Sequence, residues 1–134
     1  MVLNKIVIQH LDGSVVKGTT SDFMPNKEVF HLVPADAPPD GKPLAVIVKD
    51  LKAVFFVKDY TGDRHYRDKK DFDAAKPAMG KRIRVVFRDG EILIGTTQGY
   101  QPGRPGFFVV PADPKSNNDR CYVVSTATRE VSFI

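Results

Sequence analysis

The sequence has little of what usually points directly to a location or a chemistry. Among 134 residues there is one cysteine, Cys121, and no tryptophan. A single cysteine excludes an intramolecular disulfide, so a cytoplasmic location is the expectation. No apolar run approaches the roughly 18 residues of a membrane-spanning helix. The N-terminal stretch MVLNKIVIQHLDG has no cleavage signature and is typical of a first strand. We therefore expect a cytoplasmic protein with no membrane association.

Motifs for catalysis and metal binding are also scarce. The three histidines, His10, His31 and His65, are 21 and 34 residues apart, with no cysteine or histidine at ligand spacing. Two Thr-Thr pairs occur, but no base recurs beside them to activate a nucleophile. Cys121 lies in a predicted core strand and is interpreted as a small buried hydrophobe. We predict no enzymatic activity, no metal site and no cofactor.

Helical periodicity is the next absence, and β-forming residues dominate instead. The composition is 42% hydrophobic and 27% charged, which is typical of a globular chain. Ten glycines and ten prolines supply turns between short apolar runs rich in Val, Ile and Phe. These features predict an all-β protein.

The chain contains an internal repeat. Sliding it against itself by 77 positions aligns residues 5–57 with 82–134 without a gap and gives 15 identical pairs. The stretch DGSVVKGTTSDFMP at 12–25 thus matches DGEILIGTTQGYQP at 89–102. An ungapped match of this length indicates internal duplication. The residues identical in both copies are mainly turn formers and apolar residues, so the repeat indicates a shared fold and not a shared active site.

Each copy reads as five short strands. The first runs into an Asp-Gly pair, which is favoured in two-residue type I′ hairpins, and a proline-containing loop precedes the third. In the first copy the expected strands are Lys5–Leu11, Ser14–Thr20, Val29–Val33, Leu44–Val48 and Val54–Val57. In the second copy they are Arg82–Arg88, Glu91–Thr97, Phe107–Val110, Cys121–Ser125 and Val131–Ile134. Five short meandering strands with tight turns suggest a small barrel or a half-open sandwich.

An apolar strand, Asp-Gly, four residues, Gly-Thr and then an aromatic residue resembles the first half of Sm-like proteins. The pattern occurs as Asp12, Gly13, Gly18, Thr19 and Phe23, and again from Asp89 to Tyr100. The resemblance implies two tandem five-stranded small barrels of the Sm-like, SH3 type. The Asp, Asn and Arg-Gly positions that contact RNA in that family are not matched in either copy, so the RNA site is not carried over.

A second resemblance covers nearly the whole chain. LKAVFFVKDYTG at 51–62 and GFFVVPADPKSNNDR at 106–120 look like a domain of unknown function from bacterial proteins, found beside PilZ or other signalling modules. This resemblance implies a bacterial origin and a signalling neighbourhood. It implies no known chemistry.

The predicted organisation is a first barrel at residues 1–57, a charged connector at 58–80 and a second barrel at 81–134. The connector is rich in charges of both signs and in aromatic rings, and its only candidate helix is 71–76. We expect the connector to pack across both barrels. Phe55 is expected to face away from its own barrel, because neighbouring strand residues point to opposite faces.

The candidate functional residues are among those that the two copies do not share. Arg104, Asn117, Asn118 and Arg120 lie in predicted loops of the second copy, and loops on a rigid scaffold are where binding residues concentrate. They are our candidate partner-binding residues. The sequence therefore predicts a non-enzymatic bacterial interaction or adaptor module with a protein partner, associated with signalling.

An alternative is nucleic-acid binding through the second copy. The net charge is +4, and residues 81–134 carry eight basic and five acidic residues. Arg82, Arg84 and Arg88 on the first strand of this copy are the candidate nucleic-acid-binding residues. A further alternative, cyclic-dinucleotide binding, rests on the basic stretch Lys81–Arg84, although the Asn-x-Ser-x-x-Gly part of the PilZ motif is missing.

Overall fold

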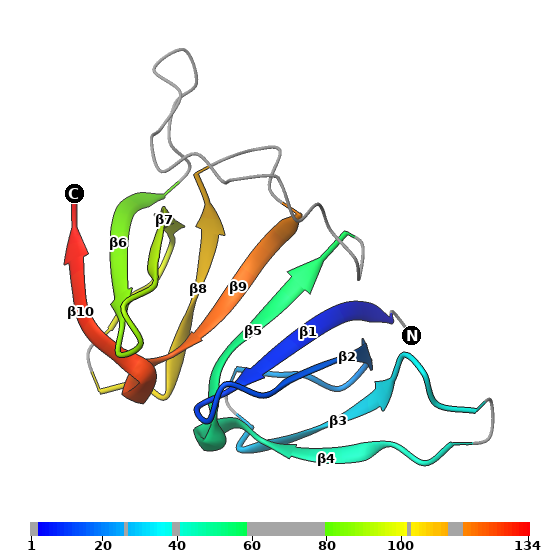
Figure 1. Cartoon of the computed structure of the whole chain (residues 1–134). Helices are drawn as coiled ribbons and strands as arrows, with labels where there is room; N and C mark the ends of the chain where they lie inside the picture. Colours follow the sequence, from blue (N-terminus) through cyan, green and yellow to red (C-terminus); the bar gives the residue numbers. More distant parts are fainter. Residues whose placement is uncertain (1–2, 26, 39–40, 59–79, 102, 113–116) are drawn as a thin grey trace.

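The computed structural model describes residues 3–25, 27–38, 41–58, 80–101, 103–112 and 117–134. Ten antiparallel strands form one sheet within these residues (Figure 1). The first half of the chain supplies β1 (Asn4–His10), β2 (Val15–Thr20), β3 (Val29–Pro34), β4 (Leu44–Ile47) and β5 (Leu51–Val57). The second half supplies β6 (Lys81–Phe87), β7 (Ile92–Thr97), β8 (Gly106–Pro111), β9 (Asn118–Val124) and β10 (Thr128–Phe133). The prediction of five strands in each copy is confirmed.

The two halves repeat the same strand order and share one sheet. The order across the sheet is β10-β6-β7-β8-β9-β5-β1-β2-β3-β4. The fifth strand of each copy therefore pairs with its first strand, and the fourth strand of the second copy pairs with the fifth strand of the first. The all-β class is confirmed, whereas the two tandem small barrels stay a prediction. The described strands join into one sheet, because the β5 edge bonds to β9 of the other half instead of to its own β4.

A short 3₁₀ turn precedes the fifth strand of each copy. The two turns are η1 (Val48–Asp50) and η2 (Ser125–Ala127), at equivalent positions of the two copies. The described residues contain no α-helix. The connector helix expected at 71–76 lies outside the described residues. β5 ends at Val57 and β6 begins at Lys81, which matches the proposed repeat boundaries, although their status as domains stays a prediction.

The Asp-Gly hairpins have three-residue loops, so the prediction of type I′ turns is wrong. The amide of Gly13 donates to the carbonyl of His10 at 3.0 Å, and that of His10 donates to Ser14 at 2.8 Å. Only the glycine has a positive φ, 92° at Gly13 and 94° at Gly90. This is a type I turn closed by a glycine bulge. Asp12 keeps a negative φ, and its Oδ1 accepts a bond from the Ser14 amide at 2.8 Å.

The glycine inside the second strand of each copy is a site of close backbone approach. A Cβ added at Gly18 would collide with the carbonyl oxygen of Val33, and one at Gly95 with that of Val110. A glycine at this point lets the third strand lie tightly against the second. This is the physical reason why Gly-Thr recurs in both copies.

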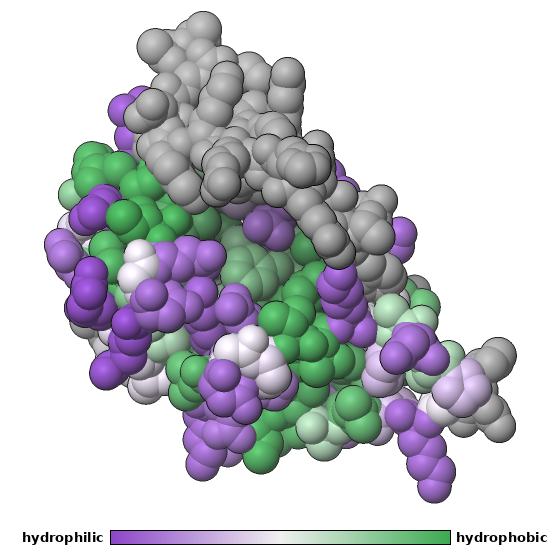
Figure 2. Space-filling model, in the orientation of Figure 1, coloured by the Kyte–Doolittle hydropathy of each residue, from purple (hydrophilic) through white to green (hydrophobic). Residues whose placement is uncertain are grey.

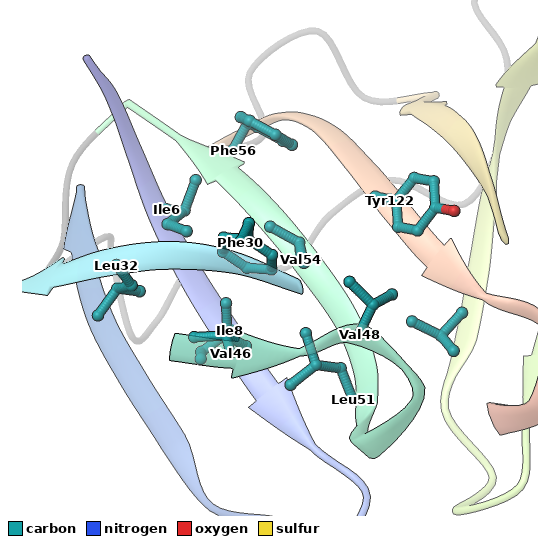
Figure 3. Packing of buried hydrophobic residues seen from close by; sticks show 11 residues of the cluster. Ile6, Ile8, Phe30, Leu32, Val46, Val48, Leu51, Val54, Phe56 and Tyr122 are labelled. Atoms are coloured by element: carbon teal, nitrogen blue, oxygen red, sulfur yellow. The ribbon is translucent and has the colours of Figure 1, made fainter. Parts of the chain in front are cut away.

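Each half has its own apolar core, but each core also contains side chains from a strand of the other half. The first-half cluster contains Ile6, Phe30 and Val54, and it also takes in Tyr122 and Val124 from β9 (Figure 3). The second-half cluster is built around residues such as Ile83 and Cys121, and it includes Ala53 from β5 with Phe55 packed against it. The expectation that Phe55 faces away from its own half is confirmed. The junction β5·β9 is thus a packed core as well as a ladder of hydrogen bonds.

Candidate functional site

A pocket of about 580 Å³ lies at the junction of the two halves, and we call it the junction pocket. Most of its surface is apolar, and two arginines belong to its lining. Its lining residues are Pro25 from the first half and Thr96, Thr97, Gln98, Gly99, Arg104, Gly106, Phe107, Phe108, Val110, Arg120 and Tyr122 from the second. The pocket therefore combines an apolar wall with fixed positive charge, an arrangement that suits ligand binding.

The sequence-predicted residues Arg104 and Arg120 both line this pocket. Arg104 is exposed in the loop before β8, where its amide donates to the carbonyl of Gln101 at 3.3 Å. Arg120 lies on β9, and its guanidinium stands 4.3 Å from the ring centroid of Phe56 and 4.9 Å from that of Phe108. Such stacking holds a guanidinium in place while its edge stays open for hydrogen bonds. Arg120 is thus a preorganised cation at the mouth of an apolar pocket.

Aromatic rings form the wall behind Arg120. Phe108 and Tyr122 meet edge to face with centroids 5.2 Å apart. Phe23 from the first half stacks against both, at 6.2 Å and 5.1 Å. Edge-to-face pairs of this kind are favourable beyond the area they bury. The wall is therefore rigid and spans both halves.

Tyr122 is held by a hydrogen bond across the junction. Its hydroxyl donates to the carbonyl oxygen of Pro25 at 3.2 Å. Burial raises the pKa of the Tyr122 phenol, so it stays protonated at neutral pH and does not act as a base. The bond ties the loop before β3 to β9 and shapes the floor of the junction pocket.

The doubled threonines have structural partners. The Thr97 hydroxyl donates to the carbonyl of Phe108 at 2.8 Å, and the equivalent Thr20 hydroxyl donates to that of His31 at 2.8 Å. Each bond joins a second strand to a third strand. This use agrees with the structural interpretation of the Thr-Thr pairs.

Asn117 and Asn118 lie at the start of β9, outside the lining of the junction pocket. The carbonyl of Asn117 accepts a bond from the Lys58 amide at 2.9 Å, and Asn118 stands opposite Val57 in the ladder. These two predicted partner-binding residues are therefore placed to extend the β5·β9 pairing. They are not part of the pocket that the two arginines line.

Arg82 and Arg84 lie on β6, and Arg88 follows directly after its last residue. Arg82 and Arg84 share a face of β6, where they stand opposite Thr96 and Ile94 of β7. Arg88 lies beyond the strand, and its Nε donates to the carbonyl oxygen of Thr126 at 2.7 Å. Six residues of extended chain separate Arg82 from Arg88 by roughly 20 Å. The nucleic-acid alternative stays a prediction.

A charge cluster that sequence reasoning missed lies at the opposite end of the junction. Lys52 on β5 is buried, and its Nζ contacts Asp89 Oδ2 at 2.7 Å and Glu91 Oε1 at 2.9 Å. Burial alone would lower the pKa of Lys52, but these two carboxylates raise it above its ordinary value. The hydrogen bond from Lys52 and the amide of Glu91 lower the pKa of Asp89. The cluster links β5 to the β6–β7 hairpin of the other half.

The histidines that the structure describes form no metal site. His31 is exposed, and its Nδ1 stands 2.7 Å from Asp22 Oδ2. Its amide and side chain help to lower the pKa of Asp22, against the effect of burial. In the described ranges no three His, Cys, Asp or Glu side chains lie together as metal ligands. His65 lies outside these ranges, and Cys121 is fully buried, as predicted.

Comparison with known proteins gives one match. The model of a family of unknown function, DUF6982, covers residues 2–134. The chain belongs to this family. No curated protein and no solved structure matches it. The resemblance to a domain of unknown function is thereby confirmed, while the Sm-like likeness and the PilZ neighbourhood stay predictions.

The described part of the chain has no helix long and apolar enough to cross a membrane.

Two residues of the junction pocket that sequence reasoning missed are Phe108 and Tyr122. A signal for them exists in the repeat, because Phe108 replaces His31 and Tyr122 replaces Ala45. An aromatic residue in one copy against a polar or small residue in the other indicates a contact between the copies.

Proposed function

We propose that this DUF6982 protein is a non-enzymatic interaction module that binds an acidic segment of a protein partner in the junction pocket. One observation carries the proposal. Arg104 and Arg120, which correspond to Lys27 and Pro43 in the first copy, line the same pocket beside Phe108 and Tyr122. The residues that both copies share build the scaffold, and residues that differ between the copies, such as Arg104 and Arg120, supply the groups that bind.

The chemistry of the pocket fits a carboxylate next to an apolar side chain. A guanidinium donates two parallel hydrogen bonds to a carboxylate, which fixes both position and charge. The aromatic wall would accept the neighbouring apolar group, and aromatic and arginine residues dominate the binding energy of protein interfaces. The pocket volume of about 580 Å³ holds one or two side chains.

A second pocket extends the surface available to a partner. It measures about 480 Å³ and shares Pro25 with the junction pocket. Val29, Ile47 and Val48 of the first half line it together with Pro105 and Val124 of the second. A partner segment of several residues would contact both pockets across the junction.

The setting that we propose is an adaptor role in bacterial signalling, built on two small-barrel halves. Its support is the resemblance of both copies to Sm-like barrels and of the chain to domains found beside PilZ modules. Binding of nucleic acid or of a cyclic dinucleotide has less support. The three candidate arginines lie apart along β6, and Arg88 already bonds to a carbonyl group.

The test is an unbiased peptide selection against the full chain. We expect the selected peptides to carry Asp or Glu beside an aromatic or aliphatic residue. Arg104→Gln and Arg120→Gln should each weaken binding about tenfold, since a charge-assisted hydrogen bond contributes about 1.5–3 kcal/mol. The measurement is fluorescence anisotropy with a labelled selected peptide, and thermal unfolding checks that each variant folds.

The matched control is Arg82→Gln with Arg84→Gln, which removes arginines of the same half outside the pocket. This variant should bind the peptide like wild type. Peptides without acidic residues, or equal loss in both sets of variants, would contradict the proposal. Binding of single-stranded DNA or of a cyclic dinucleotide that depends on Arg104 and Arg120 would also overturn it.

A further inference from the structure

The two outermost strands of the sheet are the counterparts of the two strands that join its halves. At the junction, the fifth strand of the first copy, β5, pairs with the fourth strand of the second, β9. The outermost strands are β4, the fourth strand of the first copy, and β10, the fifth of the second (Figure 1). Each edge is therefore the equivalent of a strand that already has a partner within the chain.

Exposure at these edges follows the same relation. Leu44 and Ile47 on β4, and Phe133 and Ile134 at the end of β10, are between 43% and 57% exposed. Their counterparts at the junction are Cys121, Val124, Phe56 and Val57, of which none is more than 8% exposed. In Figure 2 apolar surface lies near the C-terminal end of β10 and the start of β6, while hydrophilic residues cover much of the rest of β10. Both edges thus expose apolar side chains at positions whose counterparts are buried at the junction.

Charge follows the relation too. Inside the chain, Lys52 reaches Asp89 and Glu91 across the junction. The counterpart of Lys52 is Arg129, which is exposed on β10, and the counterpart of Asp89 is Asp12, which is exposed in the first hairpin. If β4 of a second copy lay against β10 in the way that β9 lies against β5, Asp12 of the second copy would lie close to Arg129 of the first.

We propose that a second copy of this chain docks by pairing its β4 with β10, repeating the β5·β9 junction between chains. The junction pairs Val54 with Tyr122 and Phe55 with Cys121. The corresponding pairs between chains are Val131 with Ala45 and Ser132 with Leu44. Such contact is head to tail, because the two partners use different edges, and each added chain exposes a new β10.

Two polar residues make this contact weaker than the junction. Glu130 and Ser132 stand on β10 where β5 has Ala53 and Phe55, and both β5 residues belong to the packing of the second-half cluster. A charge near the end of an edge strand limits uncontrolled pairing. The association is therefore reversible and depends on concentration, and we expect it to be measurable at about 100 µM.

The first test is sedimentation velocity of the full chain over a range of concentrations. Wild type should form dimers and larger species as concentration rises. Glu130→Ala with Ser132→Phe restores the residues of the junction and should strengthen association at least about tenfold. A wild type that stays monomeric, together with a restored variant that also stays monomeric, would overturn the proposal.

The second test separates head-to-tail docking from a symmetric dimer. Phe133→Asp blocks the β10 edge and Leu44→Asp blocks the β4 edge, so each variant alone should be monomeric. An equimolar mixture should form a dimer of one variant with the other and nothing larger. Val33→Asp, at an exposed valine on β3 outside both edges and outside the pockets, should associate like wild type.

Self-association that persists in both blocked variants, or a mixture that stays monomeric, contradicts the register. A charge reversal gives a check on the ion pair. Arg129→Asp should weaken association, and mixing this variant with Asp12→Arg should restore it. Circular dichroism on each variant confirms that its sheet is intact.

Discussion

Lys52 is the buried charge at the junction, and its two carboxylate partners are about half exposed, at 49% and 55%. This asymmetry decides what each substitution does. Asp89→Asn with Glu91→Gln leaves a buried ammonium without a counter-charge and should lower the free energy of unfolding by about 3 kcal/mol. Lys52→Met leaves two carboxylates that water can solvate, so it should cost about 1 kcal/mol or less. Urea unfolding at neutral pH measures both, and equal losses would contradict this assignment.

The same cluster predicts a pH dependence at residue scale. Because the folded pKa of Asp89 is lowered, its contribution is present above the unfolded value of about 3.9 and is lost as the pH falls through the folded pKa. Wild type should therefore lose stability relative to Lys52→Met below about pH 4. Urea midpoints between pH 3 and pH 7 test this. A constant difference over that range would show that Asp89 does not carry the effect.

At the scale of elements, the pairing of second and third strands depends on Gly18 and Gly95. An added methyl group at Gly95 meets the carbonyl oxygen of Val110 and the Val109 side chain. Gly95→Ala should lower the free energy of unfolding by about 3 kcal/mol, because backbone cannot move aside cheaply. Gly99→Ala is the control, since nothing lies within 4 Å of its added Cβ. A stability loss equal to the control's would remove the packing explanation for the recurring Gly-Thr.

At the scale of the whole molecule, the exchange of Tyr122 and Ala53 between the clusters couples the two halves. We expect a single cooperative unfolding transition. Ile6→Val and Ile83→Val are equivalent substitutions at fully buried positions, one in each cluster. Each should destabilise by about 1 kcal/mol and shift the same transition, as followed by circular dichroism and amide NMR signals. Two transitions, each moved by one variant, would show that the halves unfold independently.

Much of the local structure could be predicted from the sequence. The repeat at an offset of 77 positions, the turn prolines and the glycines predict ten short strands, and the strands lie where the pattern places them to within a few residues. The hairpin type was wrong, because Asp12 uses its carboxylate to bind the next residues and keeps a negative φ. The arginine pair could be chosen as a difference between copies, but its shared pocket could not be foreseen.

The sequence by itself determined the β class, the duplication and the turns, because these depend on neighbouring residues and on glycine, proline and apolar periodicity. Only the tertiary structure decided that β5 pairs with β9, that Tyr122 and Phe108 form a wall behind Arg120, and that Lys52 meets Asp89. The physical reason is that these contacts join residues far apart in the chain. Their geometry depends on how the two apolar cores pack against each other where β5 pairs with β9.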